Sequence, residues 1–241
     1  MLKRFVIALS ILGLVNMSSA AEEPRGEPVK TGAEQHAESS SGSTPPGAEP
    51  GKLGSWRDLN RWSFQVGLGL ISGSTLEEIV MLEGERAEGD AEGEIHFLQV
   101  SYKVAELKPV VFGQRVEVDL ELPLVLAVVD ERGRDPFMQY NVGLTLRWKS
   151  FPWNEWVYTN FETGGGLTYS SHVLETERQR HPTRDRSHIE FYWPIQLTLA
   201  HPRHREHQLV LFVHHHSGGG IFHRGGANTL GIGYRFVPWE R

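Results

Sequence analysis

The chain has 241 residues, a formal net charge of −6 and no cysteine. The absence of cysteine excludes a disulfide framework, a thiolate metal site and a lipoprotein anchor. The acidic balance lacks the basic excess that nucleic-acid binding requires, so we expect no nucleic-acid partner.

The first 20 residues are typical of a secretory signal peptide. Lys3 and Arg4 precede an apolar run over residues 5–15, and a small-residue cleavage site follows at 18–20. The run is shorter than the roughly 20 apolar residues of a membrane-spanning helix. We therefore predict that residues 1–20 direct export of the chain.

The remainder divides by composition. Residues 21–54 are rich in Glu, Ser, Gly, Pro and Ala and carry almost no large apolar side chain. We expect them to form a disordered leader, because they cannot bury enough apolar surface to fold. Residues 55–241 have the length of one ordinary domain.

Apolar and polar residues alternate throughout this domain. In the clearest segment Leu122, Leu124 and Leu126 share one face, while Asp119 and Glu121 share the opposite face. The alternation predicts eight strands, near 62–72, 95–105, 114–128, 137–149, 155–170, 188–200, 207–217 and 227–236. The expected fold is all-β, an eight-stranded antiparallel transmembrane β-barrel that follows the disordered leader.

Alternation alone does not decide whether the apolar face lines a soluble barrel or faces lipid. The longest predicted connections, 73–94 and 171–187, both follow odd-numbered strands and so lie at one end, as in outer-membrane barrels. A set of aromatic residues is expected at the other end, where rings prefer the membrane interface. The set comprises Trp62, Trp148, Phe151, Trp153, Trp156 and Trp239. These features favour the outer membrane of a Gram-negative bacterium over a soluble periplasmic barrel that binds an apolar ligand.

Three polar residues lie on the apolar face of the last two strands. His215 and Ser217 share the face of Leu209 and Leu211, and Asn228 begins the corresponding face of the final strand. Polar groups in lipid need partners, which favours a functional role. The alternative is that the three residues lie above the hydrocarbon, solvated among headgroups as ordinary polar residues near a loop. His214, His216 and His223 form an incomplete metal-binding pattern that lacks a carboxylate, so no metal site is predicted.

The stretch from His215-x-Ser217 to Gly233-Tyr234-Arg235-Phe236 resembles the C-terminal signature of the PagL-type lipid A 3-O-deacylases and related acyloxyacyl-hydrolase-like barrels. Residues 164–166, three glycines, resemble the Gly-rich fifth strand of that family. The resemblance implies an outer-membrane barrel that removes an ester-linked acyl chain from lipid A without a cofactor. It implies Ser217 as the nucleophile and His215 as the general base, with lipopolysaccharide and outer-membrane lipids as partners. No protein partner can be inferred.

Two positions depart from the pattern of this family. Gly218 stands where an Asn is common, so we expect backbone N–H groups, those of Gly218 and Gly220 foremost, to bind the oxyanion. Asn228 stands where an acid should orient the histidine, and an amide can orient an imidazole without stabilising its charge. The alternative is a non-catalytic outer-membrane barrel, structural or lipid-binding, that keeps the fold.

Overall fold

The computed structural model describes residues 58–111, 113–180, 186–222 and 225–240. The predicted signal peptide at 1–20 and the predicted leader at 21–54 lie outside the described residues. The predicted domain at 55–241 contains all of them.

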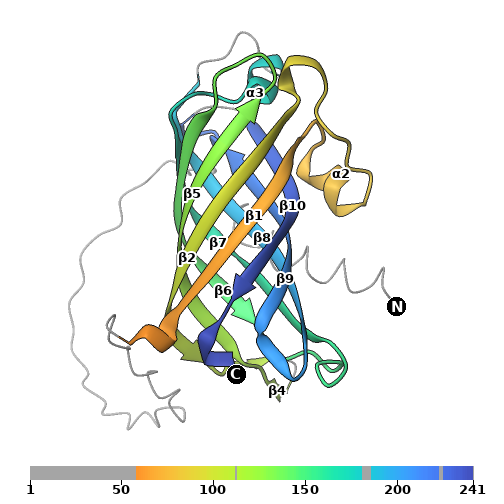
Figure 1. Cartoon of the computed structure of the whole chain (residues 1–241), viewed down its shortest axis with the longest axis vertical. Helices are drawn as coiled ribbons and strands as arrows, with labels where there is room; N and C mark the ends of the chain where they lie inside the picture. Colours follow the sequence, from red (N-terminus) through yellow and green to blue (C-terminus); the bar gives the residue numbers. More distant parts are fainter. Residues whose placement is uncertain (1–57, 112, 181–185, 223–224, 241) are drawn as a thin grey trace, which may run out of the picture. The chain divides into compact units, whose positions relative to one another are not determined.

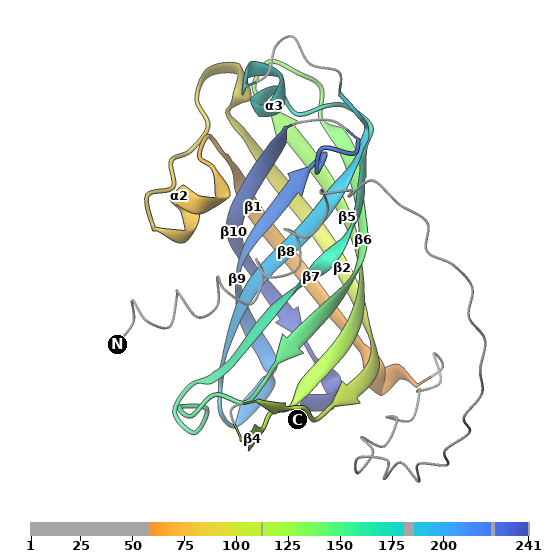
Figure 2. The same cartoon turned by 180° about the vertical axis from the view of Figure 1, so that it is seen from behind.

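Eight strands close into an antiparallel barrel, which confirms the predicted fold class (Figures 1 and 2). The strands are β1 (Trp62–Ser72), β2 (Gly93–Leu107), β5 (Val118–Glu131), β6 (Phe137–Trp148), β7 (Tyr158–Ser170), β8 (Ile189–His201), β9 (His204–Ser217) and β10 (Gly226–Phe236). Each strand pairs with its sequence neighbours in the barrel, and β1 closes the sheet against β10 with Phe64 opposite Phe236.

The alternation of residue types determines which side of the wall each side chain occupies. On β5, Leu122, Leu124 and Leu126 are exposed on the outer face, whereas Asp119 and Glu121 are buried inside. Since a strand has period two, one register serves the whole strand. The predicted faces of β5, β6, β9 and β10 agree with the structure.

The interior of the barrel has two zones. Near the end where β1 begins and β10 ends, Arg147 and Arg235 are fully buried among carboxylates. Arg147 Nη1 lies 3.3 Å from Glu121 Oε1, and Arg235 forms ion pairs with both Glu121 and Glu162. Burying these charges is tolerable only because each has a partner of opposite charge.

The other half of the interior contains a large apolar cluster, which sequence alternation did not predict, beside buried polar groups such as His214 and Glu190. Its buried cluster includes Ile95, Phe97, Val125, Val129 and Phe212. Both faces of β5 are therefore apolar over its second half, because the inner face packs against this cluster and the outer face is exposed. The interior is filled by side chains along its length.

The structure corrects the sequence-based prediction at two places, the segment before β5 and the segment after β10. A two-residue ladder, β3 (Val110–Val111) with β4 (Gln114–Arg115), precedes β5, so the predicted strand start at 114 was too early. Glu117, which has the parity of the inward Asp119 and Glu121, precedes β5 and is exposed. Trp239 belongs to η3 (Pro238–Glu240) and packs under the Lys103 ammonium, 5.0 Å from the ring centre, with a buried Nε1. Lys103 pairs with the internal Asp119, so Trp239 covers the lumen end and does not join the aromatic set at the interface.

The long connections lie at the end opposite the start of β1 and the end of β10, as predicted (Figures 1 and 2). The β1–β2 connection, residues 73–92, contains α2 (Leu76–Val80) and η2 (Gly89–Ala91), and the β7–β8 connection, residues 171–188, contains α3 (Glu175–Arg180). We call this end the loop end. No helix among the described residues is long and apolar enough to cross a membrane.

Large apolar side chains cover the outer wall. They include Phe64, Val66, Leu68, Leu98, Leu124, Val142, Leu144, Leu167, Leu197, Leu209, Leu211 and Ile232. A soluble protein does not expose a continuous surface of this kind, whereas a transmembrane barrel presents it to lipid. The soluble-barrel alternative is therefore excluded, and we call this surface the lipid belt.

Candidate functional site

Ser217 and His215 lie on the outer face of β9 at the loop end. They continue the face of Leu209 and Leu211, which are 50% and 40% exposed. The register pairs His215 with Asn228 on β10 and with Trp193 on β8. Strand pairing therefore brings together three outward-facing residues that are distant in sequence.

His215 and Asn228 form a hydrogen bond. His215 Nδ1 lies 2.7 Å from Asn228 Oδ1, and Asn228 Nδ2 donates to the carbonyl oxygen of Ser74 at 2.9 Å. Because only the amide nitrogen can donate to Ser74, its oxygen must face the histidine and accept from Nδ1–H. In this tautomer Nε2 is the basic nitrogen of the ring.

This second hydrogen bond accounts for the amide at position 228. The side chain of Asn228 faces outward but is only 1% exposed, because the β1–β2 connection passes over it. A carboxylate at this position would turn an oxygen toward the Ser74 carbonyl, and two acceptors cannot bond to each other. An amide at position 228 therefore suits the Ser74 carbonyl better than a carboxylate does, and no sequence motif points to Ser74.

Trp193 lies against the histidine from the other side. Its ring meets the His215 ring edge to face, with centroids 6.2 Å apart and an interplanar angle of 85°. Trp193 Nε1 donates to Thr163 Oγ1 at 2.8 Å, and that hydroxyl donates to the Pro194 carbonyl at 3.0 Å. These bonds hold the indole in one orientation, and it remains 38% exposed to the lipid side.

The β9–β10 turn begins next to Ser217. The Gly218 N–H donates to the Gly225 carbonyl at 3.2 Å, so the hairpin uses one of the predicted oxyanion donors. Gly219 and Gly220 have φ values of 58° and 73°, a left-handed conformation that glycine adopts with little strain. At Gly219 a side chain would also collide with Phe191, whose ring packs against the turn.

The three glycines of β7 serve different purposes. A Cβ at Gly164 or Gly166 would overlap carbonyl oxygens of β6, so these inward positions allow close approach of the two strands. Gly165 faces outward, and a Cβ there would have no atom within 4 Å. The outer wall therefore lacks a side chain at Gly165, opposite Leu144 on β6 and beside the strand that carries Trp193.

The other histidines of the run point into the barrel. His214 and His216 are fully buried, and the His216 ring stacks on Tyr192 with centroids 5.4 Å apart. Within the described ranges no group of three or more His, Cys, Asp or Glu residues could hold a metal ion. His223, the third residue of the incomplete metal pattern, lies outside the described residues.

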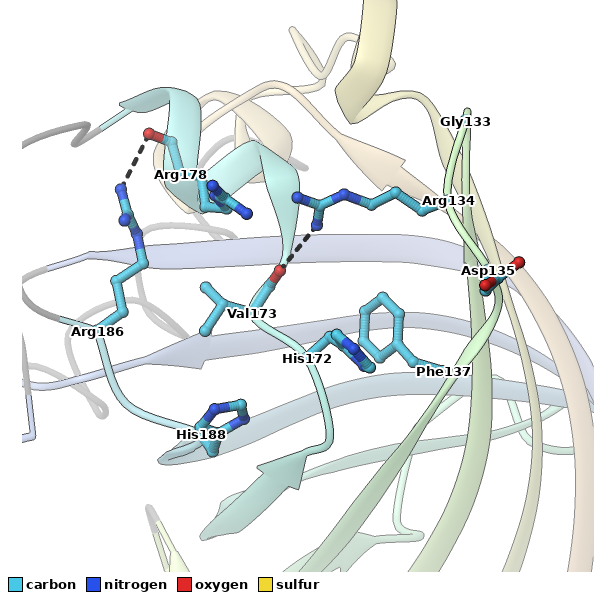
Figure 3. Close-up of a pocket in the computed structure, with 9 residues that line it drawn as sticks. All are labelled: Gly133, Arg134, Asp135, Phe137, His172, Val173, Arg178, Arg186 and His188. Atoms are coloured by element: carbon cyan, nitrogen blue, oxygen red, sulfur yellow. Dashed lines mark hydrogen bonds between the residues drawn. The ribbon is translucent and has the colours of Figure 1, made fainter.

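A separate pocket of about 630 Å³ opens among the loops, between the β5–β6 turn and the β7–β8 connection (Figure 3). Three arginines and two histidines line it, among them Arg134 and Arg178. Arg134 bonds Glu175 at 2.7 Å and donates to the Val173 carbonyl, and Arg178 lies 3.6 Å from Glu175. These contacts join the turn to α3, so we interpret the pocket as part of the loop structure. Ser217 does not line it.

Sequence reasoning singled out Ser217, His215, Asn228 and the glycines at 164–166, but it did not point to Ser74, Thr163 or Trp193. Trp193 could have been noticed, because it shares the outward face of Phe191 and Leu197 on a predicted strand. The contributions of Ser74 and Thr163 depend on inter-strand contacts, which leave no local pattern in the sequence.

No family model and no curated protein sequence matches the chain. Among solved structures it is similar to the outer membrane enzyme PagL, at 10% identity and a TM-score of 0.50, over 72% of this chain and 98% of PagL. It also matches Ail, the attachment invasion locus protein of Yersinia pestis, at 13% identity and a TM-score of 0.33, over 73% of this chain and 97% of Ail. A third match is the outer membrane protein OprG from Pseudomonas aeruginosa, at 13% identity and a TM-score of 0.32, over 73% of this chain and 95% of OprG.

The similarity to PagL shows a shared barrel fold. Together with the lipid belt, this fold confirms the predicted location in the outer membrane of a Gram-negative bacterium. In such barrels the short turns face the periplasm, so the loop end faces outward.

Proposed function

We propose that the chain hydrolyses an ester-linked acyl chain of lipid A, with Ser217 as nucleophile, His215 as general base and Asn228 as the residue that orients the base. The observation that carries the proposal is the 2.7 Å contact between His215 and Asn228, on the lipid-facing wall two residues from Ser217. Lipopolysaccharide occupies the outer leaflet, beside which this wall stands at the loop end.

The chemistry follows from the tautomer of His215. With Nδ1–H donating to Asn228, Nε2 removes the proton from the Ser217 hydroxyl as its oxygen attacks the ester carbonyl. The tetrahedral intermediate expels the sugar alcohol, which takes the proton from the imidazolium. Water then attacks the acyl-serine and loses a proton to Nε2; the Oγ–acyl bond breaks, Ser217 Oγ takes that proton back from the imidazolium, and the fatty acid leaves.

The developing oxyanion needs donors close to Ser217. The proposal assigns this role to the N–H groups of Gly220 and Gly219 in the adjacent turn, since Gly218 donates within the hairpin. One such donor contributes about 3 kcal/mol to transition-state stabilisation.

We assign Trp193 and the bare backbone at Gly165 to the path of the acyl chain. Gly165, Trp193 and Ser217 lie on three consecutive strands, β7, β8 and β9, so Gly165 is about two strand spacings, roughly 10 Å across the sheet, from the strand of the nucleophile. The indole forms one apolar wall beside the catalytic pair, and the absence of a side chain at Gly165 leaves room for methylenes. A site on an open wall suits a substrate that diffuses within the leaflet.

The test is the lipid A profile of cells that express the wild type, Ser217→Ala or His215→Ala, measured by mass spectrometry. We expect the wild type to remove one acyl chain and both variants to leave lipid A intact. His207→Ala is the matched control, because His207 has the same face of the same strand at the opposite end. All four proteins should show the gel shift on boiling that marks a folded barrel.

Two outcomes would contradict the proposal. If the wild type leaves lipid A unchanged, the chain is a non-catalytic barrel. If both site variants deacylate as well as the wild type, the activity belongs to other residues.

A further inference from the structure

The β1–β2 connection holds a preorganised projection, residues 75–84, which we call the finger. Thr75 caps α2 with a reciprocal pair of hydrogen bonds to Glu78. At the base, Ser72 Oγ donates to the Glu85 carbonyl at 2.8 Å and Glu85 N–H donates to Ser74 Oγ at 2.8 Å. Bonds on both sides of the base hold the finger in a defined position.

The tip of the finger is apolar and exposed. Met81 is 60% exposed and Leu82 is 92% exposed. Leu82 also has φ of 63°, the one positive φ of a non-glycine residue within the described ranges. This left-handed residue ends α2, because the Glu83 N–H donates to the Glu78 carbonyl and the Leu82 N–H donates to the Ile79 carbonyl. The helix end therefore fixes the direction in which the exposed Leu82 side chain projects.

The finger lies against the lipid side of the barrel. Figures 1 and 2 show α2 beside the wall near β1 and β10, whereas α3 lies over the loop end. Ser72 and Asn228 are paired across these strands and face outward, yet both are buried. Further along the same two strands, Leu68 and Ile232 belong to the exposed lipid belt. The finger therefore adjoins the belt directly.

We propose that the finger inserts Met81 and Leu82 into the acyl-chain layer of the outer leaflet, next to the candidate site. The partner is lipid hydrocarbon, because the apolar tip continues a surface that already faces it. Glu77, Glu78 and Glu83 are exposed on the same segment and stay in the headgroup layer, since a carboxylate does not enter hydrocarbon without a partner. This inference does not depend on the proposed hydrolysis.

The chain offers a direct test because it has no cysteine, so that one introduced thiol carries one label. We would attach a nitroxide to Leu82→Cys in vesicles of lipopolysaccharide and phosphatidylethanolamine and measure collisions with oxygen and with a water-soluble nickel complex. Leu68→Cys is the lipid reference, and Asp90→Cys, exposed in the same connection, is the water reference. Met81→Cys provides a second position at the tip.

We expect labels at 81 and 82 to collide preferentially with oxygen, as at 68, and the label at 90 to collide preferentially with nickel. Nickel preference at both tip positions would overturn the inference, since the tip would then lie in water. Spin–spin broadening at 82 that disappears on dilution with unlabelled chains would also overturn it, because the tip would then contact a second copy. The gel shift on boiling verifies that each variant is folded.

Discussion

Replacement of Asn228 by Asp tests why the candidate site carries an amide. In the wild type the amide accepts from His215 and donates to the Ser74 carbonyl, and the side chain is 1% exposed. Asn228→Asp keeps the acceptor toward the histidine but removes the donor toward Ser74. The two changes have opposite consequences, one for turnover and one for stability.

The expected magnitudes follow from the two hydrogen bonds. A bond to a charged group contributes about 1.5–3 kcal/mol and a neutral one about 0.5–1.5 kcal/mol. The carboxylate therefore stabilises the imidazolium by about 1 kcal/mol more, which corresponds to roughly a fivefold increase in turnover. Against this, a buried acceptor without a donor beside Ser74 costs about 1–3 kcal/mol of folding free energy.

Asn228→Asp should thus unfold about 2 kcal/mol more easily and turn over at most about fivefold faster. Stability is measured by urea unfolding in detergent micelles, followed by the gel shift, and turnover by release of fatty acid from lipopolysaccharide. Asn228→Ala, which loses both bonds, should lose stability and turnover together. An Asp variant as stable as the wild type would refute the role of Ser74, and an Ala variant with full turnover would refute the role of Asn228.

Three other predictions concern the packing of two strands, a buried ion pair and a hydrogen bond to the indole. Gly166→Ala places a methyl group 2.6 Å from a neighbouring backbone carbon and should destabilise the barrel by about 3 kcal/mol or more. Its control, Gly165→Ala, should change stability by less than about 0.5 kcal/mol. Equal urea midpoints for the two variants would contradict this prediction. Arg147→Met leaves the Glu121 carboxylate with one fewer buried partner and should cost about 3–5 kcal/mol, measured by the same unfolding curve, and an unchanged curve would refute the ionic role. Thr163→Val removes the indole's hydrogen bond and should lower turnover without shifting the urea midpoint, so wild-type turnover would argue against positioning.

The strands and their faces could be predicted because alternation is a local property of the sequence. Leu122, Leu124 and Leu126 recur at the period of a strand, and the same parity places Glu121 inside. The outward position of His215 and Ser217 at the loop end follows from the same parity together with the strand count. Each of these inferences needs only a few neighbouring residues.

The rest depends on contacts between distant segments. Asn228 meets Ser74 across 154 positions, and Trp193 meets Thr163 across 30. The inner face of β5 near Val125 is apolar because it packs against Phe212 and its neighbours, which alternation on one strand cannot reveal. Trp239 was assigned to the interface because its residue type prefers that region, but its chain position at the barrel end lets it cover Lys103 instead.

Ser74 connects the two proposals physically. Its hydroxyl oxygen accepts from Glu85 at the base of the finger, and its carbonyl accepts from Asn228. A lipid contact at the tip therefore acts on a segment bonded to the residue that orients His215. Because this bond holds the Asn228 amide in one orientation, disturbing it frees the amide to rotate and the imidazole to lose its partner. Ser74 acts through its backbone carbonyl, so Ser74→Ala should preserve the contact with Asn228 and loosen only the base of the finger. If the finger and the site are coupled, this variant should lower turnover on lipopolysaccharide in vesicles more than turnover on a short-chain ester in micelles. Equal effects on both substrates would show that the finger does not influence the site.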